Sequence, residues 1–562
     1  MTAEPARGQA AHEAGPGPGA ADVTHSAARW WALVAIAASV LVVGLDLTVL
    51  NLALPSIATS LHASTSDLQW ISDSYSLVLA ALILPAGLLG DRFGRKKLLL
   101  GALVLFGGAS LWCAYSGATG ELIAARAVLG IGAAAIFPLS LSVIPVLFAP
   151  AERTRAIGAI AGASVLSFPI GPILGGFMLT HLWWGSVFLI NVPVVVLAVI
   201  AVVTLLPESR SATRPRLDVA GIAVSGAGLV ALTYGFIKAG QDGWSDPAAV
   251  GLIAAGAVVL ALLYFMERGI ARRGGQPLAD VGLFRLPGFR WGTILATLLS
   301  FAMFGLFFTL PQYFQDVRGA SPLGSGLRLL PMIVGMVGGM VAGNRLKMPR
   351  IAITAGYLTL AAGMVLGALT TLGSSTGYMI AWVALAGVGV GLVMPNAMSA
   401  ALGDLSAERS GAGSALLTAL RQVGTTVGVA VLGTVISTSY TSRLAGTTAG
   451  LPSSLAAAVR SSVGAGVAAA QHAGSASLLN EIRTAFVTGM DVMLWICCGI
   501  AAGCALLAAV VLKPRRAAGP ADGPGELTEA LSAGAAGAAG AAGAAGAAGA
   551  AGAAGEGAQS AP

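Results

Sequence analysis

The sequence predicts an all-α protein that crosses a membrane many times. Hydrophobic residues make up 56% of the 562 residues and charged residues only 10%, with a mean hydropathy of +0.84. This composition excludes a soluble globular protein. Apolar runs near the length that a membrane helix needs, about 20 residues, recur along the chain. We predict fourteen membrane helices, at residues 30–54, 69–90, 98–116, 121–145, 156–180, 186–206, 218–238, 248–266, 291–314, 323–343, 351–372, 377–400, 411–438 and 488–512.

The segments outside these helices have a different composition. Residues 1–29 are small, polar and rich in Pro and Gly, which predicts a disordered cytoplasmic tail rather than a signal peptide. Residues 439–487 form a long outer loop without a clear motif. Residues 513–562 contain a Gly-Ala-Ala repeat that lacks proline, which predicts a second disordered cytoplasmic tail and not a collagen-like helix.

The distribution of basic residues predicts the orientation. With the N-terminus placed inside, about three quarters of the 31 Lys and Arg residues fall on the inner side of the predicted helices. Both termini are therefore expected in the cytoplasm. The same bias accounts for the net charge of +7, so we do not expect nucleic acid as a partner.

The first predicted helix carries a single acid, Asp46. Counted from Trp30, Asp46 lies roughly 24 Å along the helix, past the middle of the bilayer. An ionised carboxylate at such a depth costs on the order of 2.5–3.5 kcal/mol. The side chain must therefore be paired, lie beside water, or be protonated, and each option indicates a function.

Arg126 in the fourth helix is expected at a depth similar to that of Asp46. The two residues lie roughly 8 Å and 13 Å below the outer ends of their helices, so they can meet if these helices face each other. A guanidinium favours the charged form of a carboxyl group, while burial favours the neutral form. A conformational change that alters either influence would bind or release a proton. The alternative is a static ion pair that only specifies packing.

Other polar residues of the predicted helices are candidates for coupling or substrate binding. Asp73, near the outer end of the second helix, is either an interfacial acid in water or a second proton-coupling group. Arg421 lies roughly 16 Å into the thirteenth helix, with Gln422 beside it. We expect both, together with Asn51, to line a central cavity where Arg421 contacts substrate or a counter-charge. The alternative for Arg421 is an interhelical hydrogen bond to backbone.

The loop between the second and third helices reads GLLGDRFGRKKLLL (Gly87–Leu100). Its glycines permit a tight turn and close helix approach, and its acid can face the N-terminus of a neighbouring helix. Its basic residues hold the loop on the cytoplasmic side, and a positive anchor without further function is the alternative. We assign a conformational role to Gly87, Asp91, Arg92, Gly94 and Arg95.

This loop resembles the signature loop of the major facilitator superfamily. LDLTVLNLALP (Leu45–Pro55) is similar to the helix that marks its fourteen-span drug:proton antiporters of the QacA/EmrB type. RAVLGIGAAAIFP (Arg126–Pro138) resembles the family's Arg-x-x-Gln-Gly motif, with Leu129 in place of Gln. GAIAGASVLSFPIGPILGG (Gly158–Gly176) resembles the antiporter signature Gly-Pro-x-x-Gly-Gly, whose residues here are Gly171, Pro172, Gly175 and Gly176.

The resemblance implies a major facilitator fold of two six-helix bundles, residues 30–206 and 291–512, with two helices of 218–266 inserted between them. It implies a proton-coupled antiporter that exports lipophilic drugs or antibiotics across the bacterial cytoplasmic membrane by alternating access. We expect a monomer that uses the proton gradient without a cofactor or metal. No nucleotide loop, metal cluster or catalytic triad supports an enzyme. The alternatives are a proton-linked uptake carrier for a small nutrient and a membrane sensor without transport.

Overall fold

The computed structural model describes residues 28–148, 150–209, 219–273, 281–346, 348–403, 405 and 407–512. Within these residues the regular structure is helical. The two predicted tails lie outside the described residues, apart from Ala28 and Arg29. Both of these residues belong to the first helix, so that helix begins before the predicted end of the N-terminal tail.

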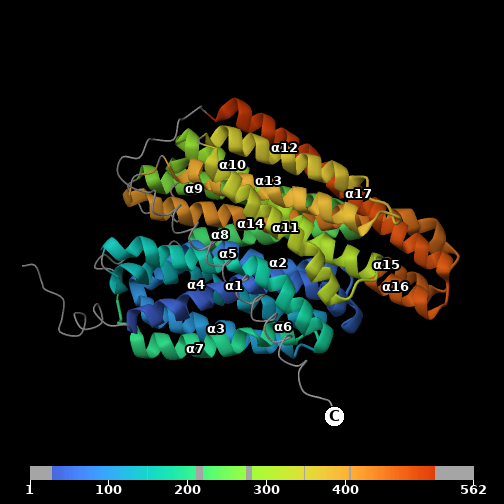
Figure 1. The fold of residues 1–562 in the computed structure, drawn as a ribbon, viewed down its shortest axis with the longest axis horizontal. Helices are drawn as coiled ribbons and strands as arrows, with labels where there is room; N and C mark the ends of the chain where they lie inside the picture. Colours follow the sequence, from blue (N-terminus) through green and yellow to red (C-terminus); the bar gives the residue numbers. More distant parts are fainter. Residues whose placement is uncertain are drawn as a thin grey trace, which may run out of the picture.

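The N-terminal half (N half) forms a bundle of long helices, drawn in blue to teal in Figure 1. Its sixth predicted helix is divided at Ile190, because Pro193 has no N–H to donate to the carbonyl of Leu189. The N half consists of α1 (Ala28–Ser60), α2 (Thr65–Phe93), α3 (Arg95–Ala114), α4 (Thr119–Leu147), α5 (Pro150–His181), α6 (Ser186–Leu189) and α7 (Asn191–Leu205).

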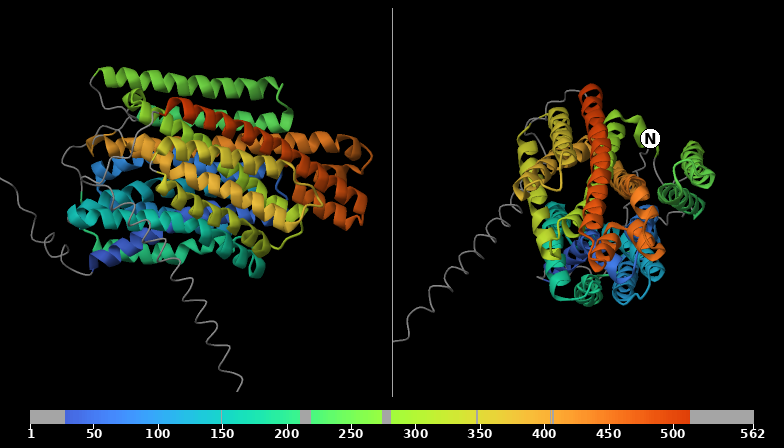
Figure 2. Two further views of the ribbon diagram at one scale, coloured as in Figure 1. Left: turned by 45° about the horizontal axis from the view of Figure 1, so that its top comes forward. Right: turned by 90° about the vertical axis from the view of Figure 1, so that its right-hand side faces the viewer.

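The C-terminal half (C half) packs against the N half with its helices in the same general direction (Figure 1). Between the halves in sequence, α8 (Val219–Asp242) and α9 (Pro247–Arg272) form a pair that lies at one side of the molecule (Figure 2). The C half consists of η1 (Val281–Arg285), α10 (Pro287–Gln312), η2 (Tyr313–Val317), α11 (Pro322–Arg345), α12 (Pro349–Ala368), α13 (Thr376–Leu402), α14 (Ala407–Ala449), α15 (Ser453–Ser461), α16 (Val463–His472) and α17 (Ala476–Val511).

Twelve helices of the described residues are long and apolar enough to cross a membrane. Besides these twelve, α2 and α5 have 29 and 32 residues and run within the same bundle. At 1.5 Å per residue, each is longer than the roughly 30 Å hydrocarbon core of a bilayer. The prediction of an all-α protein with many membrane-length helices is confirmed.

The predicted outer loop of residues 439–487 is shorter in the structure. Helix α14 continues to Ala449 and α17 begins at Ala476, while α15 and α16 form a short helical hairpin between them. The predicted helices ended where polar residues begin, because their bounds were set by hydropathy. In the structure, α14 and α17 each keep an apolar face beyond those bounds. Leu444 and Ile482, both beyond the predicted ends, are buried.

The bundle has two ends, which differ in their connections. We call the end with α15 and α16 the hairpin end, and the end with Gly94, Arg95 and Lys96 the basic end. At the hairpin end, Ser64 and Asp67 form a reciprocal capping box that starts α2. At the basic end, Gly94 joins α2 to α3 with φ +113°, a left-handed conformation that favours glycine.

Hydrogen bonds between described residues join the two halves toward the hairpin end. Gln69 Nε2 of α2 donates to Ala430 O of α14 at 3.0 Å. Gln315 Nε2 of η2 donates to Leu52 O of α1 at 2.9 Å. The hydroxyl of Thr65 donates to Ser461 O, at the end of α15, at 3.1 Å. These contacts hold the halves together at the end where α1 finishes.

Candidate functional site

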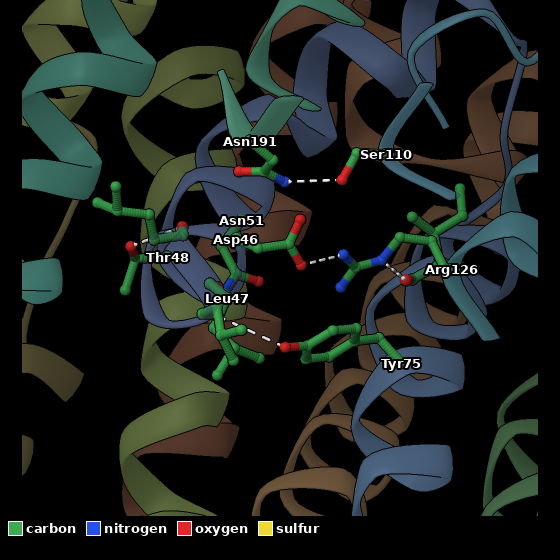
Figure 3. Close-up of polar contacts among 11 residues, drawn as sticks. Asp46, Leu47, Thr48, Asn51, Tyr75, Ser110, Arg126 and Asn191 are labelled. Atoms are coloured by element: carbon green, nitrogen blue, oxygen red, sulfur yellow. Dashed lines mark hydrogen bonds and ion pairs between the residues drawn. The ribbon is translucent and has the colours of Figure 1, made fainter. Parts of the chain in front are cut away.

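The structure brings Asp46 and Arg126 together as a buried ion pair between α1 and α4. Nη1 of Arg126 donates to Oδ2 of Asp46, and the two side chains point toward each other in Figure 3. The side chain of Arg126 is 0% exposed and that of Asp46 is 1% exposed. The predicted meeting of the two helices is confirmed, and the carboxylate is not bathed in bulk solvent.

Arg126 is further held by backbone and aromatic groups. Its Nε donates to the carbonyl of Ile71 on α2 at 3.2 Å. The guanidinium carbon lies 4.5 Å from the ring centre of Tyr75 and 5.9 Å from that of Phe188, within the range of a cation–π contact. Nη2 of Arg126 is buried without a hydrogen-bond partner. The pair therefore sits in a largely dry site, where its attraction is stronger than in water.

Sequence reasoning did not identify Tyr75 and Phe188 as part of this site. Tyr75 belongs to the WISDSY segment and is fully buried, with its hydroxyl directed to Val43 O at 3.5 Å. The sequence feature that could have indicated Tyr75 is its position two residues after Asp73, an acid within a predicted membrane helix. Phe188 lies in the short helix α6, and the sequence did not predict that its ring would lie beside Arg126.

Polar groups of α1 continue along the helix beyond Asp46 (Figure 3). Asn51 is buried, its Nδ2 donates to Leu47 O at 2.9 Å, and its Oδ1 has no partner. The hydroxyl of Thr48 donates to Leu45 O at 3.0 Å and approaches Ser167 O of α5 at 3.5 Å. Asn51 thus retains an open acceptor, and its assignment to the substrate cavity stays a prediction.

Asp73 is a completely buried acid on α2. The residue is 0% exposed, and neither carboxylate oxygen has a hydrogen-bond partner. The alternative of an interfacial acid in contact with water is wrong, because α2 begins eight residues earlier, at Thr65, and neighbouring helices cover the side chain. A second proton-coupling role for Asp73 stays a prediction.

Arg421 and Gln422 lie on α14, in the C half. Nε of Arg421 donates to Ser300 Oγ of α10 at 3.5 Å, and Nη1 lies 3.8 Å from Met398 Sδ of α13. Arg421 thus contacts a hydroxyl and a sulfur on other helices. The alternative prediction, an interhelical hydrogen bond to backbone, is not what the structure shows. Nε2 of Gln422 is buried without a partner. Their assignment to the substrate cavity stays a prediction.

The α2–α3 loop at the basic end is tied to other helices of the N half. Nη1 of Arg95 donates to Ser142 O of α4 at 3.0 Å, and its backbone N–H donates to Ser209 O at 2.9 Å. Oε1 of Glu208, after α7, accepts from the backbone N–H of Lys96 at 3.3 Å and so places a negative charge at the N-terminus of α3. Sequence reasoning did not identify Glu208 as a partner of this loop.

The other residues of the loop motif are placed as follows. Arg92 is exposed at the end of α2, Gly87 lies within α2, and the side chain of Asp91 lies outside the described part of the chain. A Cβ at Gly94 would lie 2.6 Å from Glu208 Oε1, so Glu208 would have to shift, and the φ of +113° itself disfavours any residue with a Cβ. A role of this loop in conformational change stays a prediction.

The glycines of the predicted antiporter signature lie where α5 touches two other helices. A Cβ at Gly171 would lie 2.0 Å from Thr48 Oγ1, and one at Gly175 2.7 Å from Val49 Cγ1, both on α1. A Cβ at Gly176 would lie 2.8 Å from the Cα of Leu323 on α11, in the C half. Pro172 is buried between them. Small residues at these positions allow the close helix contacts that membrane bundles use.

In Arg126–Pro138, Leu129 occupies the place of a glutamine in the resembled motif. Leu129 is 0% exposed and belongs to the apolar core of the N half. The apolar side chain of Leu129 therefore packs in the core at this position, where a glutamine could have made a hydrogen bond through its amide.

A bundle of long apolar helices in two halves, with a buried ion pair in one of them, defines a secondary transporter of the membrane. Residues 36–429 match the family model of the Major Facilitator Superfamily, and the chain belongs to this family.

Several curated proteins are similar to this chain over most of its length. The probable actinorhodin transporter of Streptomyces coelicolor is 36% identical over 434 residues, 75% of each chain. The tetracenomycin C resistance and export protein of Streptomyces glaucescens is 35% identical, over 72% of this chain and 75% of that protein. The multidrug efflux pump LfrA of Mycolicibacterium smegmatis is 35% identical, over 72% of this chain and 80% of that protein.

Solved structures share the fold at low sequence identity. A bacterial homologue of the human lysosomal transporter Spinster, in an inward-facing and unoccupied conformation, aligns with a TM-score of 0.62 at 16% identity. That alignment covers 86% of this chain and 97% of the other. The occupied inward-facing form aligns with a TM-score of 0.63 at 17% identity, over 87% and 98% of the two chains.

Proposed function

We propose that the chain is a proton-coupled antiporter of the fourteen-span drug:proton antiporter class, and that it exports lipophilic drugs or antibiotics. The observation that carries the proposal is the buried Asp46–Arg126 pair in a chain whose curated relatives are named as antibiotic and multidrug exporters. A buried carboxylate beside a cation can change its affinity for a proton when the surrounding helices move.

Alternating access supplies the movement. In one conformation Arg126 and Asp46 are paired and water is excluded, as in the contacts described above. Motion of α1 against α4 would lengthen the pair, and the carboxylate would then take a proton because the nearby positive charge no longer stabilises its charged form. Proton binding on one side of the membrane and release on the other would drive the export of a second molecule.

The basic end is proposed to face the cytoplasm, and the protein to reside in the bacterial cytoplasmic membrane as a monomer. Arg92, Arg95, Lys96 and Lys97 cluster at that end, as expected for cytoplasmic loops. The hydrogen bonds at the hairpin end then close the outer side of the transporter. Labelling of single cysteines at Gly120 and at Arg92 from either side of the membrane tests this orientation.

The proposal is tested with the Asp46→Asn variant in reconstituted vesicles. We expect the variant to fold and insert, and to lose drug export driven by an imposed proton gradient, because asparagine cannot bind and release the proton. The control is Thr204→Val, whose exposed hydroxyl donates to Ile200 O on the same half, 2.8 Å away. Export by Asp46→Asn at the wild-type rate would refute the coupling role and favour the static ion pair.

The same vesicles separate the other functions. An uptake carrier would accumulate its solute in the direction of the proton gradient, whereas an exporter moves solute against the proton flow. A membrane sensor would show no solute movement. Susceptibility of a deletion strain to a panel of lipophilic antibiotics, dyes and biocides supplies the substrates for these assays.

A further inference from the structure

Three buried polar side chains on different helices have no hydrogen-bond partner. Asp73 on α2 and Thr233 on α8 are 0% exposed, and Thr426 on α14 is 1% exposed. Both carboxylate oxygens of Asp73 and both threonine hydroxyls are without a partner. Other buried polar atoms of the described residues also lack a partner, but here an acid and two hydroxyls do so on three helices that pack together, and buried polar groups are usually hydrogen-bonded.

The contacts on the hairpin side show that these three helices meet. Gln69 Nε2 of α2 donates to Ala430 O of α14 at 3.0 Å, which aligns Gln69 with Ala430. The ring centres of Trp70 on α2 and Tyr234 on α8 lie 5.9 Å apart. Asp73 lies one turn beyond Gln69 toward the basic end, and Thr426 lies one turn beyond Ala430 in the same direction.

The contacts on the basic side bring the same helices together again. Leu77 and Ala80 of α2 form one buried apolar cluster with Leu229 of α8, and Val423 of α14 packs against it. Each polar residue lies about one helical turn nearer the hairpin end than a member of this cluster: Asp73 relative to Leu77, Thr233 relative to Leu229, and Thr426 relative to Val423. Residues four apart share a helix face, so the three polar groups lie between these two sets of contacts.

No cation in the described residues pairs with Asp73. On α8, Lys238 forms its salt bridges with Asp242 and Asp246. On α14, the guanidinium of Arg421 contacts Ser300 and Met398. Arg126, which donates to Ile71 O on α2, forms its salt bridge with Asp46. The layer around Asp73 therefore contains hydroxyl groups but no compensating charge.

We propose that Asp73, Thr233 and Thr426 form a proton-binding site that closes only when Asp73 carries a proton. These oxygens make no hydrogen bond with one another in the present structure. With a slightly closer approach of the three helices, a neutral carboxyl group could donate its O–H to one threonine oxygen and accept from the other threonine hydroxyl. An ionised carboxylate buried in the same closed layer would have no cation to compensate its charge. The site joins the N half, the inserted pair and the C half, and α8 thereby contributes directly to coupling.

The direction of proton movement in this inference rests on the proposed function. When the halves separate at the hairpin end, α2 leaves α14 and water reaches Asp73. A hydronium ion from that side transfers its proton to the carboxylate and leaves water. The neutral site can then close against Thr233 and Thr426, so that proton binding promotes closure of the hairpin end.

The test measures the opening of the hairpin end directly as a function of pH. Spin labels are placed at Gly120→Cys on α4 and Gly377→Cys on α13, two exposed positions in different halves where a side chain meets nothing within 4 Å. The background lacks the native cysteines, and distances are measured in lipid nanodiscs from pH 5 to pH 9. We expect the short, closed distance to predominate at low pH and a longer distance to appear as the pH rises.

Asp73→Asn is expected to hold the closed distance over the whole pH range, because the amide is neutral throughout. The pair Thr233→Val and Thr426→Val removes both hydroxyls without changing the shape. Losing hydrogen bonds to the neutral carboxyl should move the midpoint of closure about half to one pH unit lower. Thr426→Ser in the Thr233 wild-type background keeps both hydroxyls and should keep the midpoint.

Thr418→Val is the matched control on α14, because its hydroxyl already donates to Ser414 O at 2.8 Å. An unchanged midpoint in the double valine variant would overturn the role of the threonines. A pH-dependent distance that persists in Asp73→Asn would overturn the whole site. Vesicle export is measured in parallel: distances that depend on Asp73 without any proton-driven export contradict only the proposed function.

Discussion

Removing Arg126 while leaving Asp46 in place should destabilise the protein strongly. In Arg126→Gln, the carboxylate keeps its buried position, with 1% of its side chain exposed, but has lost its cation. Breaking a buried pair by removing one partner costs about 3–5 kcal/mol, because an uncompensated charge is left behind. The double variant Asp46→Asn with Arg126→Gln removes both charges, so we expect it to be more stable than Arg126→Gln alone.

The assay is a double-mutant cycle on the free energy of unfolding in mixed detergent micelles. We expect a coupling energy of about 2–3 kcal/mol between the two positions. Effects that add within about 0.5 kcal/mol would show that the pair is not coupled.

Two further predictions concern glycines at close contacts. Gly176→Leu should slow export and lengthen the distance between the Gly120 and Gly377 labels, because its Cβ would lie 2.8 Å from the backbone of Leu323 in the other half; wild-type distances would contradict this. Gly94→Ala, at φ +113°, should lower the free energy of unfolding by about 1–2 kcal/mol, whereas Gly101→Ala, with open space around it, should not. Equal effects in thermal unfolding would refute the difference.

Much of the fold could be predicted from the sequence, because long apolar runs have few alternatives to membrane helices. The order of the helices and the depths of Asp46 and Arg126 followed from counting residues at 1.5 Å each. The helix boundaries were less predictable where an apolar face continues outside the hydrocarbon layer. The extensions of α14 to Ala449 and of α17 from Ala476 are of this kind.

The partners within the site were less accessible to sequence reasoning. Electrostatics required Asp46 to be paired, to lie beside water or to be protonated, and Arg126 was the basic residue expected at a similar depth. The aromatic rings of Tyr75 and Phe188 around Arg126 depend on how α2 and α6 rotate about their axes. The burial of Asp73 likewise depends on α8 and α14, which are far from it in the sequence. The pattern of residues within one helix does not show which residues of distant helices it will contact.

The helical hairpin of α15 and α16 belongs mechanically to one half of the molecule. It is connected covalently to α14 and α17, and the hydroxyl of Tyr440 on α14 donates to Val459 O within it at 2.8 Å. Arg460 also donates to the hydroxyl of Thr448 on α14 at 2.7 Å. In the proposed alternating access, the hydrogen bond from Thr65 of the N half to Ser461 O would therefore have to break, and the hairpin would move together with the C half.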